Sequence, residues 1–127
     1  MVLDTHAWIW WVDDPRRLSA AARAAISEAP RRLVSAVSCL EVATLARRRR
    51  IELDRSPGDW VAAALGRPAV EASAVTPEIA VAAGSLPDDF PGDRADRIIY
   101  ATAIATGATL VTRDDTIGRF DRRRTVW

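Results

Sequence analysis

Residues 92–115 read GDRADRIIYATAIATGATLVTRDD, and this run predicts a helix that leads directly into a strand. From Arg94 onward, small and apolar residues recur at helical spacing. They are Ile98, Ala101, Thr102 and Ala105. Gly107 supplies the left-handed residue that commonly ends a helix. The β-branched run 109–112 then predicts a short strand, and a strand that follows a helix after so tight a turn is typical of a parallel βαβ unit.

Acidic residues stand at both ends of this unit. Asp93 and Asp96 begin the expected helix, and Asp114 and Asp115 follow the expected strand. In an open parallel sheet, the strand ends and the helix starts on the carboxyl side share one edge, where ligands bind. Each acid also has an ordinary structural interpretation as a helix cap, a dipole partner or a turn residue. These four acids alone therefore do not establish a site.

The rest of the chain predicts alternating strands and helices. Further strands are expected at 2–3, 33–35, 69–72 and 125–127, and further helices are expected at 5–12, after Ser19, at 38–50, 57–65, 77–85 and 116–120. This order predicts an α/β fold. We expect a single domain over residues 1–127, a three-layer sandwich with a central, mainly parallel sheet of four to five strands flanked by helices.

Composition removes several classes of chemistry. The chain of 127 residues has one cysteine and one histidine, which excludes an internal disulfide and a zinc site built from several His and Cys residues. All 18 basic residues are arginine, so Schiff-base chemistry and a P-loop lysine are excluded too. Any metal must be held by oxygen atoms. Because the sequence shows neither a signal peptide nor a long apolar run, we expect a cytoplasmic protein without membrane contact.

Two further acids are expected at the same sheet edge. Asp4 ends the first strand, and Glu41 follows the second strand within Ser38–Glu41. These residues match the S-x-x-E capping box, which predicts a helix start at Ser38 and explains both residues structurally. The arginine run 47–50 at the other end of that helix is expected to complement the helix dipole and to point away from the acidic edge. Phosphate binding and contact with a partner are the alternatives for the arginines.

The first helix carries Trp8, Trp10 and Trp11. Core packing of at least one of them and a dimer or partner surface, where tryptophan is enriched, are both open interpretations.

Together the acids predict a metal site. Asp4, Glu41, Asp96 and Asp114 come from well-separated parts of the chain. Carboxylates packed together repel one another unless a cation lies between them. Carboxylate and hydroxyl oxygens favour hard ions such as Mg²⁺ or Mn²⁺.

At this point the chain resembles the PIN-domain ribonucleases of the VapC toxin type. The resemblance covers nearly the whole length and rests on four motifs, LDTH at 3–6, SAVSCLEVATL at 35–45, GDRADRIIYATA at 92–103 and TLVTRD at 109–114. It implies a metal-dependent endoribonuclease that is the toxin of a type II toxin–antitoxin pair. Such toxins are usually homodimers and are neutralised by a small DNA-binding antitoxin of the VapB type.

The resemblance also implies roles for individual residues. The expected catalytic acids are Asp4, Glu41, Asp96 and Asp114. Mg²⁺ or Mn²⁺ is expected on Asp4, Asp96 and Asp114, directly or through water, while Glu41 positions or deprotonates the attacking water. Ser38 and Thr112 match polar positions that help to order the acids or the water in the family. Asp93 and Asp115 are further supporting candidates, and the resemblance leaves open whether Asp93 is a ligand, a cap or an outer-shell acid. Arg94 stands where the family often has proline.

Three further residues are candidates for contact with RNA, namely Arg97, Arg113 and His6. A salt bridge within the site is the equal alternative for the two arginines, and a local structural role is the alternative for His6. The net charge of +1 predicts no strong general affinity for nucleic acid.

Two rival functions follow from the same residues. A phosphatase that uses Asp4 as nucleophile would need a lysine near the phosphate, which the chain lacks. A non-catalytic PIN-like module that only binds a partner would not need four converging acids.

Overall fold

The computed structural model describes all 127 residues. The chain forms seven α-helices, one short 3₁₀ helix and five strands. In chain order they are β1 (Val2–Leu3), α1 (Thr5–Asp13), η1 (Pro15–Arg17), α2 (Ala20–Glu28), β2 (Arg32–Ser35), α3 (Ala36–Arg47), α4 (Pro57–Leu65), β3 (Val70–Ser73), α5 (Pro77–Gly84), α6 (Arg94–Ala105), β4 (Leu110–Val111), α7 (Asp115–Phe120) and β5 (Thr125–Val126).

The five strands form one parallel sheet in the order β3-β2-β1-β4-β5. The predicted α/β sandwich is therefore confirmed. The chain moves from β1 to β2 and β3 on one side, and then returns to place β4 on the other side of β1. Ligands bind where the strand order reverses in this way. The reversal lies between β1 and β4, the strands that precede Asp4 and Asp114.

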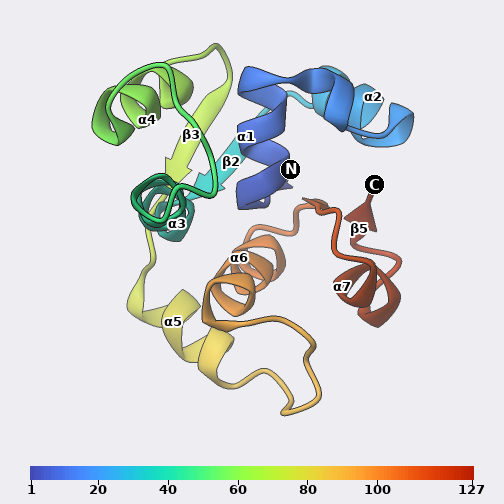
Figure 1. Ribbon diagram of the computed structural model, residues 1–127. Coiled ribbons are helices and arrows are strands. Elements are labelled where there is room, and N and C mark those ends of the chain that lie inside the picture. Colours follow the sequence, from blue (N-terminus) through green and yellow to red (C-terminus); the bar gives the residue numbers. More distant parts are fainter.

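Successive residues of the central strands face opposite helix layers, as the period of a strand requires. Leu3 pairs with Val34 and Val111, and these residues pack with α1, α2 and α4. Their neighbours Val2, Leu33 and Leu110 pack with α6 on the other face. Figure 1 shows the two layers, with α1 and α2 on one side of the strands and α5 and α6 on the other.

The tryptophans of α1 belong mostly to the core. Trp8 is fully buried and meets Trp60 of α4 edge to face, with ring centroids 5.0 Å apart. Trp10 is also buried and lies against Trp127. The core interpretation of these residues is confirmed, which leaves only Trp11 partly accessible.

Helix α6 buries residues on both sides of the apolar stripe that the spacing predicted. Ile99, Tyr100 and Ala103 face the sheet, whereas Ala101 and Ile98 pack against α5. Ala105, which the spacing placed inside, is exposed. The stripe was incomplete because α6 is covered on two sides. The helix ends as predicted, with Gly107 at φ 62°.

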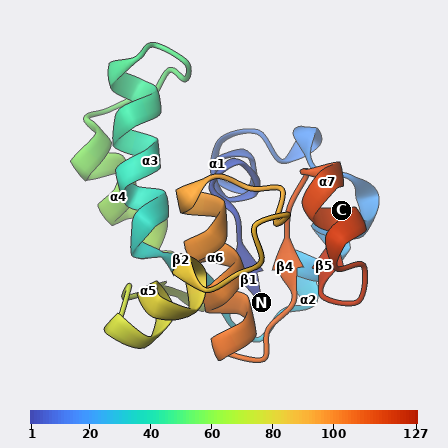
Figure 2. The ribbon, with the colours of Figure 1, turned by 90° about the horizontal axis from the view of Figure 1, so that it is seen from below.

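Helix α3 leaves the sheet rather than lying flat on it. Figure 2 shows α3 rising from the end of β2 and running beside α4, away from the strands. This contradicts our prediction that the last turn of α3 points away from the acidic edge. Arg48 and Arg50 instead line a groove that also reaches Glu41 and Asp93.

None of the helices has both the length and the apolar character needed to cross a membrane.

Candidate active site

One pocket of about 500 Å³ brings together the four predicted catalytic acids. Asp4 follows β1, Asp114 follows β4, Asp96 lies in the first turn of α6, and Glu41 lies in the first half of α3. The lining residues are Asp4, Thr5, His6, Trp10, Arg17, Glu41, Asp93, Asp96, Arg113 and Asp114. The pocket opens at the carboxyl ends of β1 and β4, where the strand order reverses. We call it the acid pocket.

Three of the acids are held by helix starts, which confirms their structural interpretation and leaves their proposed functional roles as predictions. Asp4 Oδ1 accepts a hydrogen bond from the amide of Ala7 at 2.7 Å. Asp114 Oδ1 accepts from the amides of Thr116 and Ile117 at 2.7 and 3.1 Å. Such caps fix one carboxylate oxygen. The other oxygen of Asp114 is left without a protein partner.

Asp93 and Asp96 form a reciprocal capping box at the start of α6. The amide of Asp96 donates to Asp93 Oδ1, and the amide of Asp93 donates to Asp96 Oδ2, both at 2.9 Å. This arrangement holds two carboxylates side by side at the pocket wall. Asp93 therefore orders the helix start while also lining the acid pocket.

Ser38 and Glu41 do not form the predicted capping box. Helix α3 begins three residues earlier, with Ser35 as its N-cap, because strand β2 passes into the helix without a loop. Ser38 is fully buried inside the first turn. The hydroxyl of Thr5 hydrogen-bonds to Ser38 Oγ at 2.9 Å and to Glu41 Oε1 at 2.5 Å. Thr5 thus links the end of β1 to the acid on α3.

Thr112 lies between the two strand-end acids. Its side chain is buried, and its Oγ1 accepts a hydrogen bond from the amide of Asp114 at 3.1 Å. The same hydroxyl lies against Asp4 and favours the charged form of that acid. Thr112 therefore connects Asp4 with Asp114.

Burial and mutual repulsion raise the pKa values of three acids. Burial is the main cause for Asp4 and for Glu41, whose pKa values are raised above their ordinary range. Burial and the nearby charges of Asp93 and Glu41 raise the pKa of Asp96 to about 7. Asp114 differs: burial opposes its charge, but hydrogen bonds from Thr116 and Ile117 outweigh that effect and lower its pKa.

The donor set fits a hard divalent cation. All the acids offer oxygen, and their raised pKa values mark an electrostatic conflict that a cation would relieve. No three His, Cys, Asp or Glu side chains are arranged so that all would contact one ion. This spacing is consistent with an ion held partly through water, because Mg²⁺ keeps several of its waters in proteins.

The other predicted residues fall into two groups. His6 and Arg113 line the acid pocket, whereas Asp115 lies in the first turn of α7 and lines a neighbouring pocket. Arg97 does not line the acid pocket. Its guanidinium group donates to the carbonyls of Leu86 and Pro87 at 3.1 and 3.0 Å, which ties α6 to the loop before it.

Comparison with known proteins identifies the family. The model of the PIN domain family matches residues 1–123. Over the full chain and 98% of its own length, the curated protein named Ribonuclease VapC22 of Mycobacterium tuberculosis is 43% identical. The chain belongs to the PIN-domain family of VapC-type ribonucleases.

Solved structures share the fold of this chain at low sequence identity. A toxin–antitoxin complex from Klebsiella pneumoniae has a TM-score of 0.72 at 20% identity, with 99% of this chain and 95% of that chain covered. VapBC2 from Rickettsia felis, bound to a promoter DNA fragment, has a TM-score of 0.71 at 14% identity, with 98% and 96% covered. Mycobacterium tuberculosis VapC20, a Sarcin-Ricin loop cleaving toxin, has a TM-score of 0.65 at 19% identity, with 93% of each chain covered.

Sequence reasoning missed three residues that line the acid pocket, Thr5, Trp10 and Arg17, and also Gly92, which lies against Asp96. Thr5 stands beside Asp4 in the LDTH motif, which was a signal for its role. Gly92 precedes the capping box, and a Cβ atom there would lie 2.4 Å from Cβ of Asp96. Trp10 and Arg17 gave no signal, because only the fold brings them to the acid pocket.

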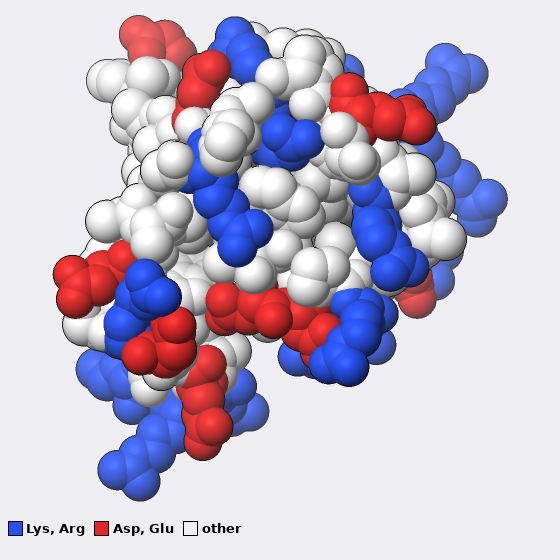
Figure 3. All heavy atoms as spheres, turned by 90° about the horizontal axis from the view of Figure 1, so that it is seen from above, with Lys and Arg blue, Asp and Glu red and all other residues white.

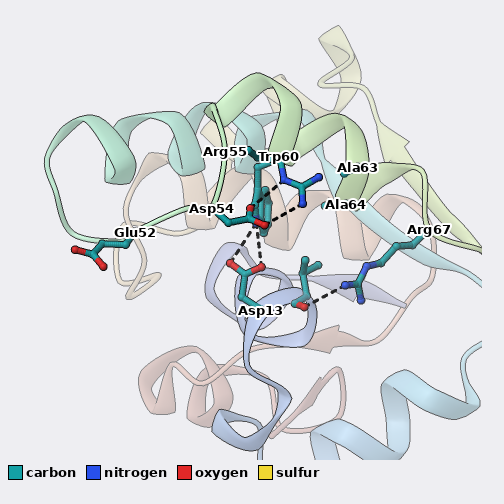
Figure 4. Close-up of a pocket in the computed structure, with 9 residues that line it drawn as sticks. Asp13, Glu52, Asp54, Arg55, Trp60, Ala63, Ala64 and Arg67 are labelled. Carbon is teal, nitrogen blue, oxygen red and sulfur yellow. Dashed lines mark hydrogen bonds and ion pairs between the residues drawn. The ribbon is translucent and has the colours of Figure 1, made fainter.

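The domain has two other notable pockets. A groove of about 920 Å³ between α3 and α6 meets the acid pocket at His6, Glu41 and Asp93. A pocket of about 480 Å³ lies beside α4 (Figure 4). There the indole of Trp60 donates to Asp13 at 3.0 Å and Arg67 donates to the carbonyl of Val12 at 3.1 Å, so these contacts fasten α4 to α1.

Proposed function

We propose that this protein cleaves RNA internally in a reaction that depends on Mg²⁺ or Mn²⁺, as the toxin of a VapBC-type pair. The observation that carries the proposal is the convergence of Asp4, Glu41, Asp96 and Asp114 in one pocket, with burial and repulsion raising the pKa values of three of them. Such a costly arrangement of buried acids is typical of a cation-dependent active site.

Asp4, Asp96 and Asp114 are the residues that would hold the ion, directly or through water. When bound, a divalent ion stabilises the negative charge that develops on the scissile phosphate and acidifies water. The protein supplies the orientation of these carboxylates, because the helix starts and Thr112 fix one side of each group. Thr112 thereby acts as a positioning residue.

Glu41 is proposed to orient the attacking water and accept its proton. Thr5 fixes Oε1, and Oε2 has no protein partner, so one oxygen is free for water. Because burial raises the pKa of Glu41, its carboxylate is a stronger base than an exposed one. Attack by water on the phosphorus would leave 3′-hydroxyl and 5′-phosphate ends.

The proposal is tested with purified protein, freed of any bound partner, on total bacterial RNA with Mg²⁺ or Mn²⁺. New 5′ ends are mapped, and chelator and the Asp96→Asn variant serve as controls. We expect discrete ends that are absent from both controls. Ends that persist in Asp96→Asn would contradict the assigned site. Asp96→Asn keeps an oxygen for the capping box, so its folding is checked by circular dichroism.

The partner is proposed to be a VapB-type antitoxin that occupies the groove between α3 and α6. Leu40 is 66% exposed at this groove, and Arg48, Arg50 and Arg94 line it. An apolar segment with acidic residues is complementary to such a surface. Because the groove meets the acid pocket at Glu41, an occupant would also restrict access to it. We expect Leu40→Glu to abolish copurification of a co-expressed antitoxin without loss of cleavage.

We further propose a cytoplasmic homodimer. The buried Trp8 and Trp10 are not available for its interface, but Val81 of α5 is 69% exposed and Ile104 of α6 is 45% exposed. Light scattering of the wild type and Val81→Arg tests whether two copies join through the exposed apolar side chain of α5.

A further inference from the structure

Two arginines form one wall of the acid pocket and converge on a single tryptophan. Arg17 ends η1, and Arg113 lies between β4 and α7. Their guanidinium carbons lie 4.5 Å and 5.4 Å from the ring centroid of Trp10. All three residues line the acid pocket. Residues from three separate segments thus build an aromatic and cationic wall beside the carboxylates.

Neither Arg17 nor Arg113 makes an ion pair or a side-chain hydrogen bond with the protein. The chain's ion pairs use other arginines, which are Arg16, Arg31, Arg55 and Arg124. Side-chain hydrogen bonds from arginine to protein acceptors come from Arg16, Arg32, Arg55, Arg67, Arg97 and Arg124. The N–H donors of Arg17 and Arg113 therefore remain free, although several carboxylates line the same pocket.

Trp10 holds the two guanidinium groups in place. The ring is itself fixed, because it is buried and lies 5.7 Å from the ring of Trp127 and 5.6 Å from that of His6. Stacking on an aromatic face orients a guanidinium group and leaves its edge donors available. A guanidinium edge matches two phosphate oxygens, which makes it a directional phosphate ligand.

We propose that Arg17 and Arg113 bind the phosphates that flank the scissile bond of the RNA, with Trp10 as their platform. This inference rests on the proposed function and names positioning residues for it. The RNA strand would then cross the acid pocket on the Trp10 side, whereas the groove between α3 and α6 adjoins the pocket through His6, Glu41 and Asp93.

The low overall charge supports a role for local phosphate contacts of this kind. The net charge is only +1, and Figure 3 shows acidic and basic side chains interspersed over one face of the molecule. Without a broad basic field, phosphate contacts beside the carboxylates must supply much of the affinity. Two unpaired guanidinium groups at the pocket wall meet this requirement.

The test uses Asp96→Asn protein, which we expect to bind RNA without cutting it, and a short fluorescein-labelled single-stranded RNA. Binding is followed by fluorescence anisotropy over a range of KCl concentrations. Arg17→Ala and Arg113→Ala are each expected to weaken binding about tenfold. Each is also expected to reduce the slope of log affinity against log salt by about 0.7, the value for one lost phosphate contact on a single strand.

The neighbouring Arg16 provides a matched control. Its side chain is 87% exposed and pairs with Asp14 at 2.7 Å, so Arg16→Ala should leave affinity and slope unchanged. Arg17→Lys should keep the salt slope but recover only part of the affinity, because an ammonium group lacks the planar edge. In the cleaving protein, Arg17→Ala should raise KM more than it lowers kcat.

The outcomes separate this inference from the proposed function. If the wild type cleaves RNA but Arg17→Ala and Arg113→Ala both match Arg16→Ala in affinity and slope, the phosphate wall is disproved and the nuclease stands. If the protein neither binds nor cleaves RNA, both proposals fail. Equal unfolding midpoints for the arginine variants exclude a merely structural explanation of weaker binding.

Discussion

Gly92 is the residue whose lack of a side chain most directly shapes the acid pocket. A Cβ atom at this position would lie 2.4 Å from Cβ of Asp96 and 2.7 Å from the ring of Phe90. Real Cβ contacts are not so close, so either Asp96 or the loop must move. The backbone of Gly92 thus serves as the surface against which Asp96, a proposed metal ligand, rests.

We expect Gly92→Ala to displace Asp96 and to lower kcat by about a hundredfold, the usual cost of moving a reacting group by about 1 Å. Cleavage of the mapped RNA site measures the effect. Gly84→Ala is the matched control, because a Cβ atom there meets nothing within 4 Å. Equal activity of the two variants would show that the loop, and not Asp96, absorbs the added methyl group.

Thr5 gives a second prediction about a single side chain. Thr5→Val keeps the shape but removes the hydroxyl that reaches Ser38 and Glu41. We expect the variant to lose about 1–3 kcal/mol of unfolding free energy, because the buried Ser38 is left without this partner. Cleavage should also slow as Glu41 loses its orientation. Thr5→Ser, which retains the hydroxyl, should restore both the unfolding free energy, measured in urea, and the rate of cleavage.

Helix α6 and the loop before it form one unit through Arg97. Its guanidinium group reaches the carbonyls of Leu86 and Pro87 and lies over the ring of Phe90 at 5.5 Å. The loop ends at Gly92, so Arg97 helps to place the helix start that carries Asp93 and Asp96.

We therefore expect Arg97→Ala to destabilise the fold by about 2 kcal/mol, since hydrogen bonds from a charged group contribute about 1.5–3 kcal/mol. Its RNA affinity in the Asp96→Asn background should stay near that of the parent. Urea unfolding and fluorescence anisotropy measure the two quantities. Unchanged stability with weaker RNA binding would return Arg97 to the substrate-contact role that the sequence suggested.

Elements that are defined by helix-capping residues and by a regular spacing of apolar residues were predictable from sequence. The short β1, the helices that follow Ser19, Ser56 and Thr76, and the stop at Gly107 all appear where the residues indicated. The start of α3 was not predictable, because Ser35 and Ser38 are both acceptable caps. Only the continuous passage from β2 decides between them. The third strand begins one residue late, after Ala69 in a left-handed conformation.

For the molecule as a whole, parallel topology explains why the acids, and Arg113 beside them, could be grouped from sequence while Arg17 and Trp10 could not. Strand ends on one edge must meet, which brings Asp4 and Asp114 together. Arg17 follows a helix rather than a strand, and its approach to Trp10 depends on how α1 and η1 pack. That packing is a tertiary property without a local signal.

The charge state of the whole pocket predicts a coupling between pH, metal and stability. Asp4, Glu41 and Asp96 have pKa values raised above those of the unfolded chain, with that of Asp96 at about 7. Their ionised forms are disfavoured in the fold, so metal-free protein should lose stability as the pH rises from about 4 to about 7. Asp114, whose pKa is lowered, acts in the opposite sense and only at lower pH.

Mg²⁺ should offset this loss, because it competes with protons for the same carboxylates. At about a hundred times its Kd it should add about 2.7 kcal/mol to the unfolding free energy. We expect a larger rise in Tm at pH 8 than at pH 5 in thermal unfolding, and little rise at either pH in Asp96→Asn. An equal Tm shift at both pH values would mean that the ion binds elsewhere.

The pairing of β1 with β4 makes the pocket a late product of translation. A ribosome completes Asp4 and Glu41 long before it reaches Leu110–Val111 and the Asp114 that follows. Until that segment has left the exit tunnel, strand β1 lacks a neighbour on one side and the pocket lacks its fourth acid. The nascent chain therefore has no assembled acid pocket until this late segment can pair with β1.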